Sequence, residues 1–163
     1  VTHHSDFYDL DDVAVAPTPH RDGGPPLWAA GSTPAAQRRA GARFDGWFPI
    51  GSSEHFRDGL AEVTAAAEAA GRELSAVAAA TYVTVALNDD VDAAEQEMND
   101  FMAAYYPAPP EVMRSVQATY AGPDEGFADW IAEFTDAGAR HVILRFAGRH
   151  DEHLERCIEL LRP

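Results

Sequence analysis

The stretch PPLWAAGSTPAAQRRAGARFDGWFPIG, residues 25–51, predicts a strand, a helix and a second strand in close succession. The apolar run at 26–30 is stopped by a glycine, which is typical of a short buried strand. Thr33 and Pro34 then indicate a helix start, because threonine caps helices and proline fits their first turn. A second short apolar run at 46–50 predicts the next strand.

The region after Ser53 predicts an amphipathic helix. Phe56, Leu60, Val63 and Ala67 recur at steps of four, three and four, which places them on one helix face. A strand-helix-strand-helix order is therefore expected over the first half of the chain.

The same alternation continues to the end of the chain. β-Branched residues late in 77–87 predict a third strand. A long helix then follows and ends at the prolines of YYPAPPEV, because proline cannot continue a helix. Further helices are expected at 111–122 and from 122 onward, and a strand at 141–148. The final helix carries an apolar side, made of Leu154, Cys157, Ile158 and Leu161.

Alternating strands and helices imply an α/β fold with parallel strands joined by crossover helices. Two architectures fit this order: an open doubly wound sheet, or half of a (β/α)8 TIM barrel, which needs about 250 residues when whole. Residues 1–25 predict an extended loop segment with one strand-like piece in DDVAVAP, residues 11–17.

The composition excludes several classes of protein. A formal net charge of −15 over 163 residues disfavours binding to nucleic acid or to an anionic membrane. No apolar run approaches the roughly 20 residues of a membrane span. The single cysteine, Cys157, cannot form an internal disulfide, so we expect a cytoplasmic protein with a buried, unreactive thiol. The chain begins at Val1 rather than methionine, as expected of a processed or partial chain.

Three stretches, taken in order, resemble the luciferase-like flavin-dependent oxidoreductases. Residues 25–51 match that family's P-x-W-x-x-G-x-S/T-P strand, small-residue helix and D-G-W/F segment. The opening VTHHSDFYDLDDVAVAP is similar to its V-x-H-x-G-x-F/Y segment, with Ser5 in place of the glycine. AGPDEGFADWIAEFTDAGARHVILRF is similar to its late helix-strand unit. The resemblance covers nearly all 163 residues.

The resemblance implies that residues 1–163 form a single partial domain, the C-terminal half of a (β/α)8 TIM barrel. Such a half contains about four parallel strands with helices on the outside. The N-terminal half of the family's barrel has no counterpart in this sequence. We therefore expect an N-terminal barrel half or a second copy of the chain as partner, and an oligomer in solution.

The resemblance also implies an enzyme that uses reduced flavin (FMN) or the deazaflavin coenzyme F420 to oxidise or oxygenate a small organic substrate. It assigns no catalytic acid or base to this half. The alternative is a non-catalytic half-barrel that acts as an assembly or binding module.

Two loops are implied to hold the phosphate side of the coenzyme. By resemblance, Ala29, Ala30 and Gly31 end the first of these strands, while Ile50, Gly51, Ser52 and Ser53 lie between the second strand and its helix. A helix N-terminus presents unpaired N–H groups and partial positive charge, which favour anions. The structural alternative is that Ser53 only caps the helix.

Other polar residues are weaker candidates. Arg145 lies inside an apolar strand and needs a partner, either an anion at the barrel mouth or an internal carboxylate. His141, in the same strand, is interpreted as structural. His3, His4 and Asp6 are too closely spaced for a helix-based site, so the sequence predicts no metal centre.

Overall fold

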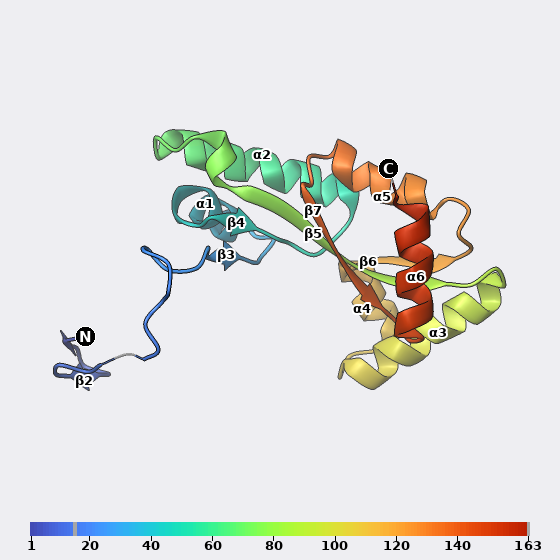
Figure 1. The fold of residues 1–163 in the computed structure, drawn as a ribbon, viewed down its shortest axis with the longest axis horizontal. Coiled ribbons are helices and arrows are strands. Elements are labelled where there is room, and N and C mark those ends of the chain that lie inside the picture. The colour runs from blue at the N-terminus through green and yellow to red at the C-terminus, as the bar shows by residue number, and fades with distance from the viewer. Residues whose placement is uncertain (15, 163) are drawn as a thin grey trace.

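The computed structural model describes residues 1–14 and 16–162 of the chain (Figure 1). The strands, in chain order, are β1 (His3–His4), β2 (Asp9–Leu10), β3 (Trp28–Ala29), β4 (Gly46–Trp47), β5 (Ala78–Leu87), β6 (Ala118–Gly122) and β7 (His141–Phe146). The helices are α1 (Pro34–Arg43), α2 (Ser53–Ala69), α3 (Val91–Tyr105), α4 (Pro110–Val116), α5 (Phe127–Asp136) and α6 (His150–Leu160), with a short 3₁₀ helix at Leu74–Ala76.

Strand β5 is the centre of a five-stranded parallel sheet. Its first two residues pair with β4, which in turn pairs with β3. Residues 83–87 pair with β6, and residues 80–85 pair with β7. The prediction of parallel strands at 26–30, 46–50, 77–87 and 141–148 is confirmed, although β3 and β4 are only two residues long.

The expected helix at 111–122 is wrong in its second half. Helix α4 ends at Val116, and Ala118–Gly122 form β6. Backbone pairing with residues 83–87 of β5 makes this segment a strand. Glycine and proline are absent between α4 and β6, so the sequence gives no local signal for the break.

Alternate side chains of β5 enter two separate apolar clusters. Val83, Val85 and Leu87 pack in a large core with residues of α1, α2, α5 and α6, which therefore lie on one face, as expected for the outside of a barrel. Ala86 instead packs against Met98 and Met102 of α3. The pair α3–α4 thus departs from that expectation and covers the other face at the carboxyl end of β5 (Figure 1).

Helix starts follow the predicted local chemistry. Thr33 is the N-cap of α1, with Pro34 at the first helical position. Asp90 caps α3 by accepting hydrogen bonds from the N–H groups of Asp92 and Ala93. Among the described residues, no helix combines the length and apolar character needed to cross a bilayer.

Residues 1–25 contain a small antiparallel hairpin formed by β1 and β2. Figure 1 shows this hairpin away from the parallel sheet, at the end of an extended stretch. The strand-like piece predicted at 11–17 includes Val15, which lies outside the described residues.

The apolar side predicted for the last helix is buried only in part. Cys157 is 2% exposed, whereas Leu154, Ile158 and Leu161 remain 47%, 50% and 38% exposed. The burial expected for Cys157 is therefore confirmed, whereas the other three apolar residues of that side remain partly exposed.

Candidate functional site

Two clefts adjoin where β3 and β4 end. The first, of about 580 Å³, is bordered by residues 50–53, by residues 114–119 and by α5; we call it the serine cleft. The second, of about 560 Å³, is lined mainly by apolar groups of the two strand ends and by Tyr82; we call it the apolar cleft. Ser32 and Ile50 line both, so the two clefts form one continuous surface with a polar and an apolar part.

The backbone at Gly51 has φ +125°, a conformation that favours glycine. An added Cβ would meet the Cβ of His55 at 3.5 Å, an ordinary contact, so backbone conformation rather than crowding requires the glycine. The prediction that this glycine marks a turn into a helix is confirmed, because α2 begins two residues later.

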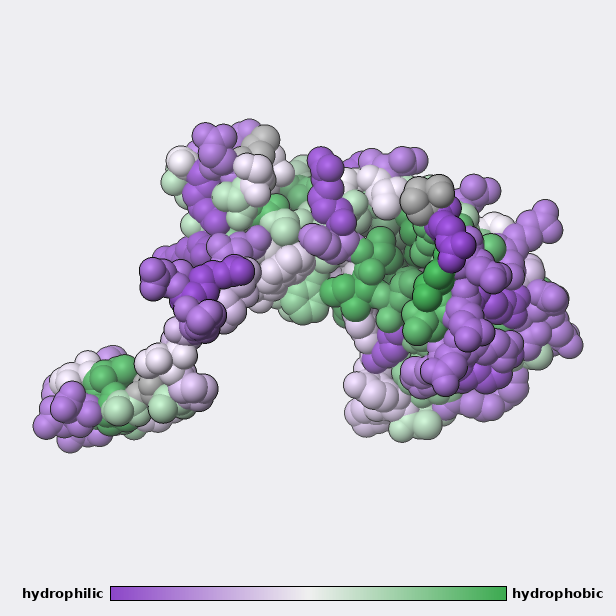
Figure 2. Space-filling model, in the orientation of Figure 1, coloured by the Kyte–Doolittle hydropathy of each residue, from purple (hydrophilic) through white to green (hydrophobic). Residues whose placement is uncertain are grey.

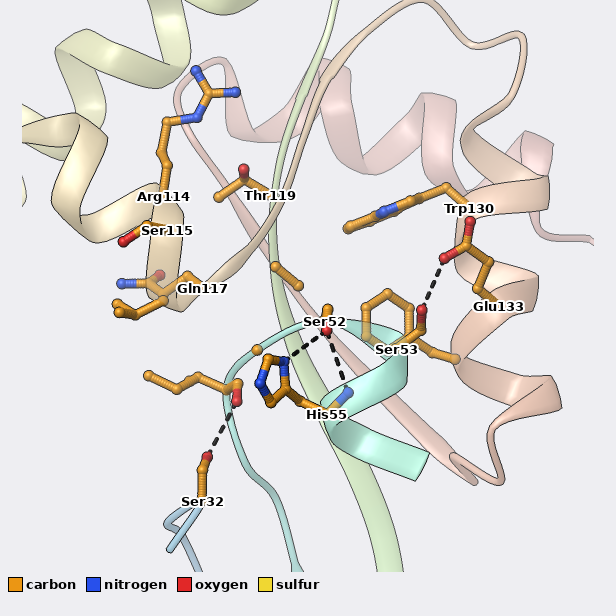
Figure 3. A pocket seen from close by; sticks show the side chains of 15 residues that line it. Ser32, Ser52, Ser53, His55, Arg114, Ser115, Gln117, Thr119, Trp130 and Glu133 are labelled. Carbon is orange, nitrogen blue, oxygen red and sulfur yellow. Dashed lines mark hydrogen bonds between the residues drawn. The ribbon is translucent and has the colours of Figure 1, made fainter. Parts of the chain in front are cut away.

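Ser52, not Ser53, caps α2. Its Oγ accepts a hydrogen bond from the N–H of His55 at 3.3 Å and lies 2.9 Å from His55 Nδ1 (Figure 3). The structural alternative that Ser53 is the cap is wrong, because Ser53 is already the first helical residue.

Ser53 has a different partner, 80 residues away in sequence. Its Oγ donates a hydrogen bond to Oε2 of Glu133, on α5, at 2.9 Å (Figure 3). A carboxylate therefore lies beside the N-terminus of α2, where the helix dipole favours negative charge.

Arg114 lines the serine cleft, and Figure 3 shows its guanidinium directed away from Ser52 and Ser53. It forms a two-point ion pair with Glu95 of α3, one contact of which spans 3.0 Å, and it also donates to Asn99 at 3.2 Å. Hydrogen bonding from Arg114 lowers the pKa of Glu95 below its usual value, so the pair is charged at neutral pH. The positive charge of this arginine is largely compensated within the protein.

The guanidinium of Arg145 is surrounded by aromatic rings. Its guanidinium is 4.8–5.3 Å from the ring centroids of Tyr82, Phe101, Tyr105 and Tyr106. Its Nη2 donates to the Tyr106 hydroxyl at 2.5 Å, and further bonds reach one threonine and one glutamine. The described residues form no ion pair with it, so the internal carboxylate considered from the sequence is wrong.

The structure brings six of the eight predicted coenzyme-binding residues to the two clefts. These are Ala30, Gly31, Ile50, Gly51, Ser52 and Ser53. Ala29 instead packs against the large core, and Arg145 lines neither cleft. Sequence reasoning misses the wall formed by residues 114–119, because the pattern predicts one continuous helix over that segment. It also misses Glu133, which looks like any exposed helical carboxylate.

The lone thiol does not belong to this site. Cys157 is buried in the large core, as predicted, and burial raises its pKa to about 11. A thiol with so high a pKa carries almost no thiolate at neutral pH, which makes it a poor nucleophile.

Solved structures share this architecture. An F420-dependent secondary alcohol dehydrogenase in complex with an F420-acetone adduct is 16% identical, with a TM-score of 0.79 over 99% of this chain and 55% of that one. The coenzyme F420-dependent tetrahydromethanopterin reductase from Methanopyrus kandleri is 15% identical, with a TM-score of 0.73 over 96% and 56%. A riboflavin lyase (RcaE) with modified FMN and riboflavin is also 15% identical, with a TM-score of 0.69 over 99% and 48%.

These likenesses establish the fold, and the chain spans about half the length of the structures it matches. A search of curated proteins found no match. The family model for luciferase-like monooxygenases matches residues 1–162, nearly the whole sequence. This chain therefore belongs to the luciferase-like monooxygenase family.

Proposed function

We propose that this chain is the phosphate-binding half of a luciferase-like oxidoreductase that uses FMN or F420 to oxidise or oxygenate a small organic substrate. The observation that supports it most directly is the junction of the apolar and serine clefts at Ser32 and Ile50. A flavin or deazaflavin has the matching shape, an aromatic ring system with a phosphate-bearing side chain. The similar structures include two F420-dependent enzymes and one with modified FMN, so both coenzymes are candidates.

The residues present fit the phosphate end of such a coenzyme. Gly51 exposes its backbone, and the first N–H groups of α2 have no intrahelical partner. The side-chain contribution is smaller than the sequence alone implies, since both serine hydroxyls already have partners. Backbone groups would therefore hold the phosphate, while Ala30 and Gly31 line the adjoining apolar cleft.

The apolar cleft fits the ring system. Phe48, Ile50 and Tyr82 offer an apolar surface, and the guanidinium of Arg145 lies 5.1 Å from the ring centroid of Tyr82. When bound, the coenzyme supplies hydride transfer or oxygen activation. The protein's residues would orient the ring and exclude water. The guanidinium of Arg145 would add positive potential near the apolar cleft, through its contact with Tyr82.

We propose that an N-terminal barrel half, or a second copy of this chain, completes the fold around this single partial domain. Strands β3 and β7 are each paired on one side only among the described residues, and such edges favour further pairing. Apolar side chains stay exposed on β7 and α6, including Ile143 and Ile158 at 40% and 50%. Figure 2 shows apolar residues gathered over β7 and the adjoining side of α6.

The test is coenzyme binding by the protein in the assembly in which it is isolated. We expect visible absorbance from bound flavin or deazaflavin, and saturable quenching of FMN fluorescence. Gly51→Val should weaken FMN binding about tenfold or more, since the valine fills the backbone approach and opposes the positive φ.

Gly71→Val is the matched control. Gly71 also has positive φ, at the far end of α2, and lies outside both clefts. It should lose stability through the same strain and keep FMN affinity. Equal loss of affinity in both variants would reject the phosphate role of Gly51.

The second candidate is a non-catalytic half-barrel that serves as an assembly module. It is favoured by the chain's half-length match and by the exposed apolar side of α6. Stable association without binding of FMN, F420 or riboflavin would support this candidate and reject the first.

A further inference from the structure

Arg145 is the second-last residue of β7 and lies on the face of the sheet opposite the large core, which we call the inner face. Val142 and Leu144 pack with that core, so Arg145, at the alternate position, points the other way. It is paired in register with Thr84 of β5, which is paired with Thr119 of β6. Thr119 lines the serine cleft, so this row of residues links that cleft to Arg145 (Figure 3). The carboxyl end of a strand is where barrel enzymes bind their ligands.

The charge of Arg145 is not neutralised by the described part of the chain. The sequence has 27 acidic residues, yet none of those described forms an ion pair with Arg145. By contrast, Arg114, Arg149 and Arg156, with side chains 21–37% exposed, are each paired with a carboxylate. A half-buried guanidinium without a counter-charge has lost hydration that a bound anion would replace.

The guanidinium is held in place on one side and open on the other. Its Nη2 donates to the oxygens of Tyr106, Gln117 and Thr84 at 2.5, 3.1 and 3.2 Å. Its Nη1 has no hydrogen-bond partner in the described ranges, 1–14 and 16–162. No side-chain nitrogen within them is both buried and unpartnered, so Nη1 is open to solvent. Two N–H donors of a fixed cation are therefore free to bind an anion.

We propose that Arg145 binds a carboxylate of the organic substrate, so that the enzyme selects substrates in which a carboxylate adjoins an apolar group. This inference rests on the proposed function and names its substrate class. Tyr82 lines the apolar cleft 5.1 Å from the guanidinium, and its register partner Ile143 is 40% exposed. These two residues contact the apolar part of the substrate. Residues 50–53, assigned to the coenzyme phosphate, are not among the partners of Arg145, so the two anionic groups have separate sites.

The experiment compares benzoate with benzamide, which is similar in shape but uncharged. Calorimetric titration uses the protein in the assembly in which it is isolated, without coenzyme, at about 0.15 M salt. We expect benzoate to bind about tenfold more tightly than benzamide, since hydrogen bonds between charged groups contribute at least that factor. Arg145→Met keeps the apolar stem and should remove the preference. Arg145→Lys keeps the charge without the planar fork and should retain a preference of about two- to threefold.

Arg140→Met is the matched control. Arg140 directly precedes β7, is exposed, and lines neither the serine cleft nor the apolar cleft. Its replacement removes the same charge near the other end of the same strand. The ratio of benzoate to benzamide affinity should therefore stay within about twofold of wild type.

Three results would overturn the inference and leave the proposed function standing. If Arg145→Met lowers the thermal midpoint but leaves the ratio unchanged, Arg145 only attaches α3 to the sheet. If the wild type shows no preference for benzoate and Arg145→Met weakens association, the arginine pairs with a carboxylate of the partner. If saturating FMN displaces benzoate, Arg145 binds the coenzyme. If neither FMN nor F420 binds, the proposed function falls, and the assignment of the carboxylate to its substrate falls with it.

Discussion

Helices α2 and α6 both carry an apolar stripe, but the two stripes are covered to different extents. In α2, Phe56, Val63 and Ala67 are at most 2% exposed, because the helix packs between α1 and α5. In α6, only the side toward the sheet is covered, and Ile158 is 50% exposed. An amphipathic pattern therefore predicts a face that can be buried, while the presence of a neighbour decides whether it is buried.

The difference matches the positions of the two helices in a half-barrel. Helix α2 lies in the middle of the βα series and has a neighbour on each side. Helix α6 follows β7, the last strand, whose outer edge is unpaired among the described residues. In a closed barrel, a further strand and helix would cover both.

The core beneath α2 should be the region whose stability is most reduced by removal of a buried side chain. Phe56 is 2% exposed and stacks on Trp47, with ring centroids 5.4 Å apart. Phe56→Ala should lower the free energy of unfolding by about 3–5 kcal/mol, since it leaves a cavity among buried rings. Denaturant unfolding measures this, with Arg57→Ala, at the exposed neighbouring position, as control. A loss under about 1 kcal/mol would contradict a rigid core here.

The next largest effect on the free energy of unfolding should come from the buried hydrogen bonds that attach α6 to the sheet. His153 is fully buried, and its Nε2 accepts a hydrogen bond from the Leu87 N–H at 3.0 Å. Its Nδ1 therefore carries the proton and donates to the Gly148 carbonyl at 2.8 Å. His153→Leu leaves both backbone groups unpaired and should cost about 1–3 kcal/mol for each.

Thermal and denaturant unfolding of His153→Leu and His150→Leu check this expectation. His150 is exposed on the same helix, so its replacement should change stability by about 0.5 kcal/mol or less. Equal stability of the two variants would show that the two hydrogen bonds of His153 contribute nothing to the free energy of unfolding.

A smaller effect comes from the ion pair that joins α3 to the start of α6. Arg149 donates to both carboxylate oxygens of Glu97, and this bonding lowers the pKa of Glu97 below its usual value of 4.5. A lowered pKa in the folded state means that the stabilisation is present above pH 4.5 and is lost as the pH falls through the folded pKa. Glu97→Gln should cost about 1 kcal/mol or less at neutral pH, because Arg149 is partly exposed.

Unfolding measured from pH 7 down to about pH 3 checks the sign. The difference in the free energy of unfolding between wild type and Glu97→Gln should shrink as the pH falls. Glu155→Gln, at an exposed position of α6, should show no such convergence. A difference that grows as the pH falls would contradict the assignment of this stabilisation to the ionised carboxylate of Glu97.

Local signals account for what the sequence predicted well. The threonine-proline start of α1 and the prolines that end α3 each act through their own backbone, so no tertiary information is needed. Strand β6 depends instead on pairing with β5, and the chain around 117 carries no turn residue to announce it.

The candidate site likewise combines local features, which the sequence predicts, with contacts between distant residues, which it does not. The conformation of Gly51 and the cap beside it are local properties, and the sequence located them to within one residue. The Ser53–Glu133 hydrogen bond joins residues 80 positions apart, and the pair of Arg114 with Glu95 joins two helices. Such contacts are set by how α2, α3, α4 and α5 pack, and a helical pattern gives the face of a side chain but not its partner.

The smallest effect on stability should come from the exposed stripe of α6, and it decides the comparison. Ile158→Lys and Leu154→Lys should each change the free energy of unfolding by about 0.5 kcal/mol or less, because both side chains are nearly half exposed. If a second copy or a barrel half covers this stripe, a buried lysine there should abolish association, since an unpaired charge is costly in an apolar interface. Light scattering at micromolar concentration measures the association state, and Glu159→Gln, which changes the net charge by the same single unit, is the control. If the wild-type protein stays monomeric and shows no apolar surface that binds dye, the exposed stripe of α6 needs no further neighbour. If the wild-type protein assembles and only the lysine variants do not, α6 lacks in the single chain the neighbour that α2 has.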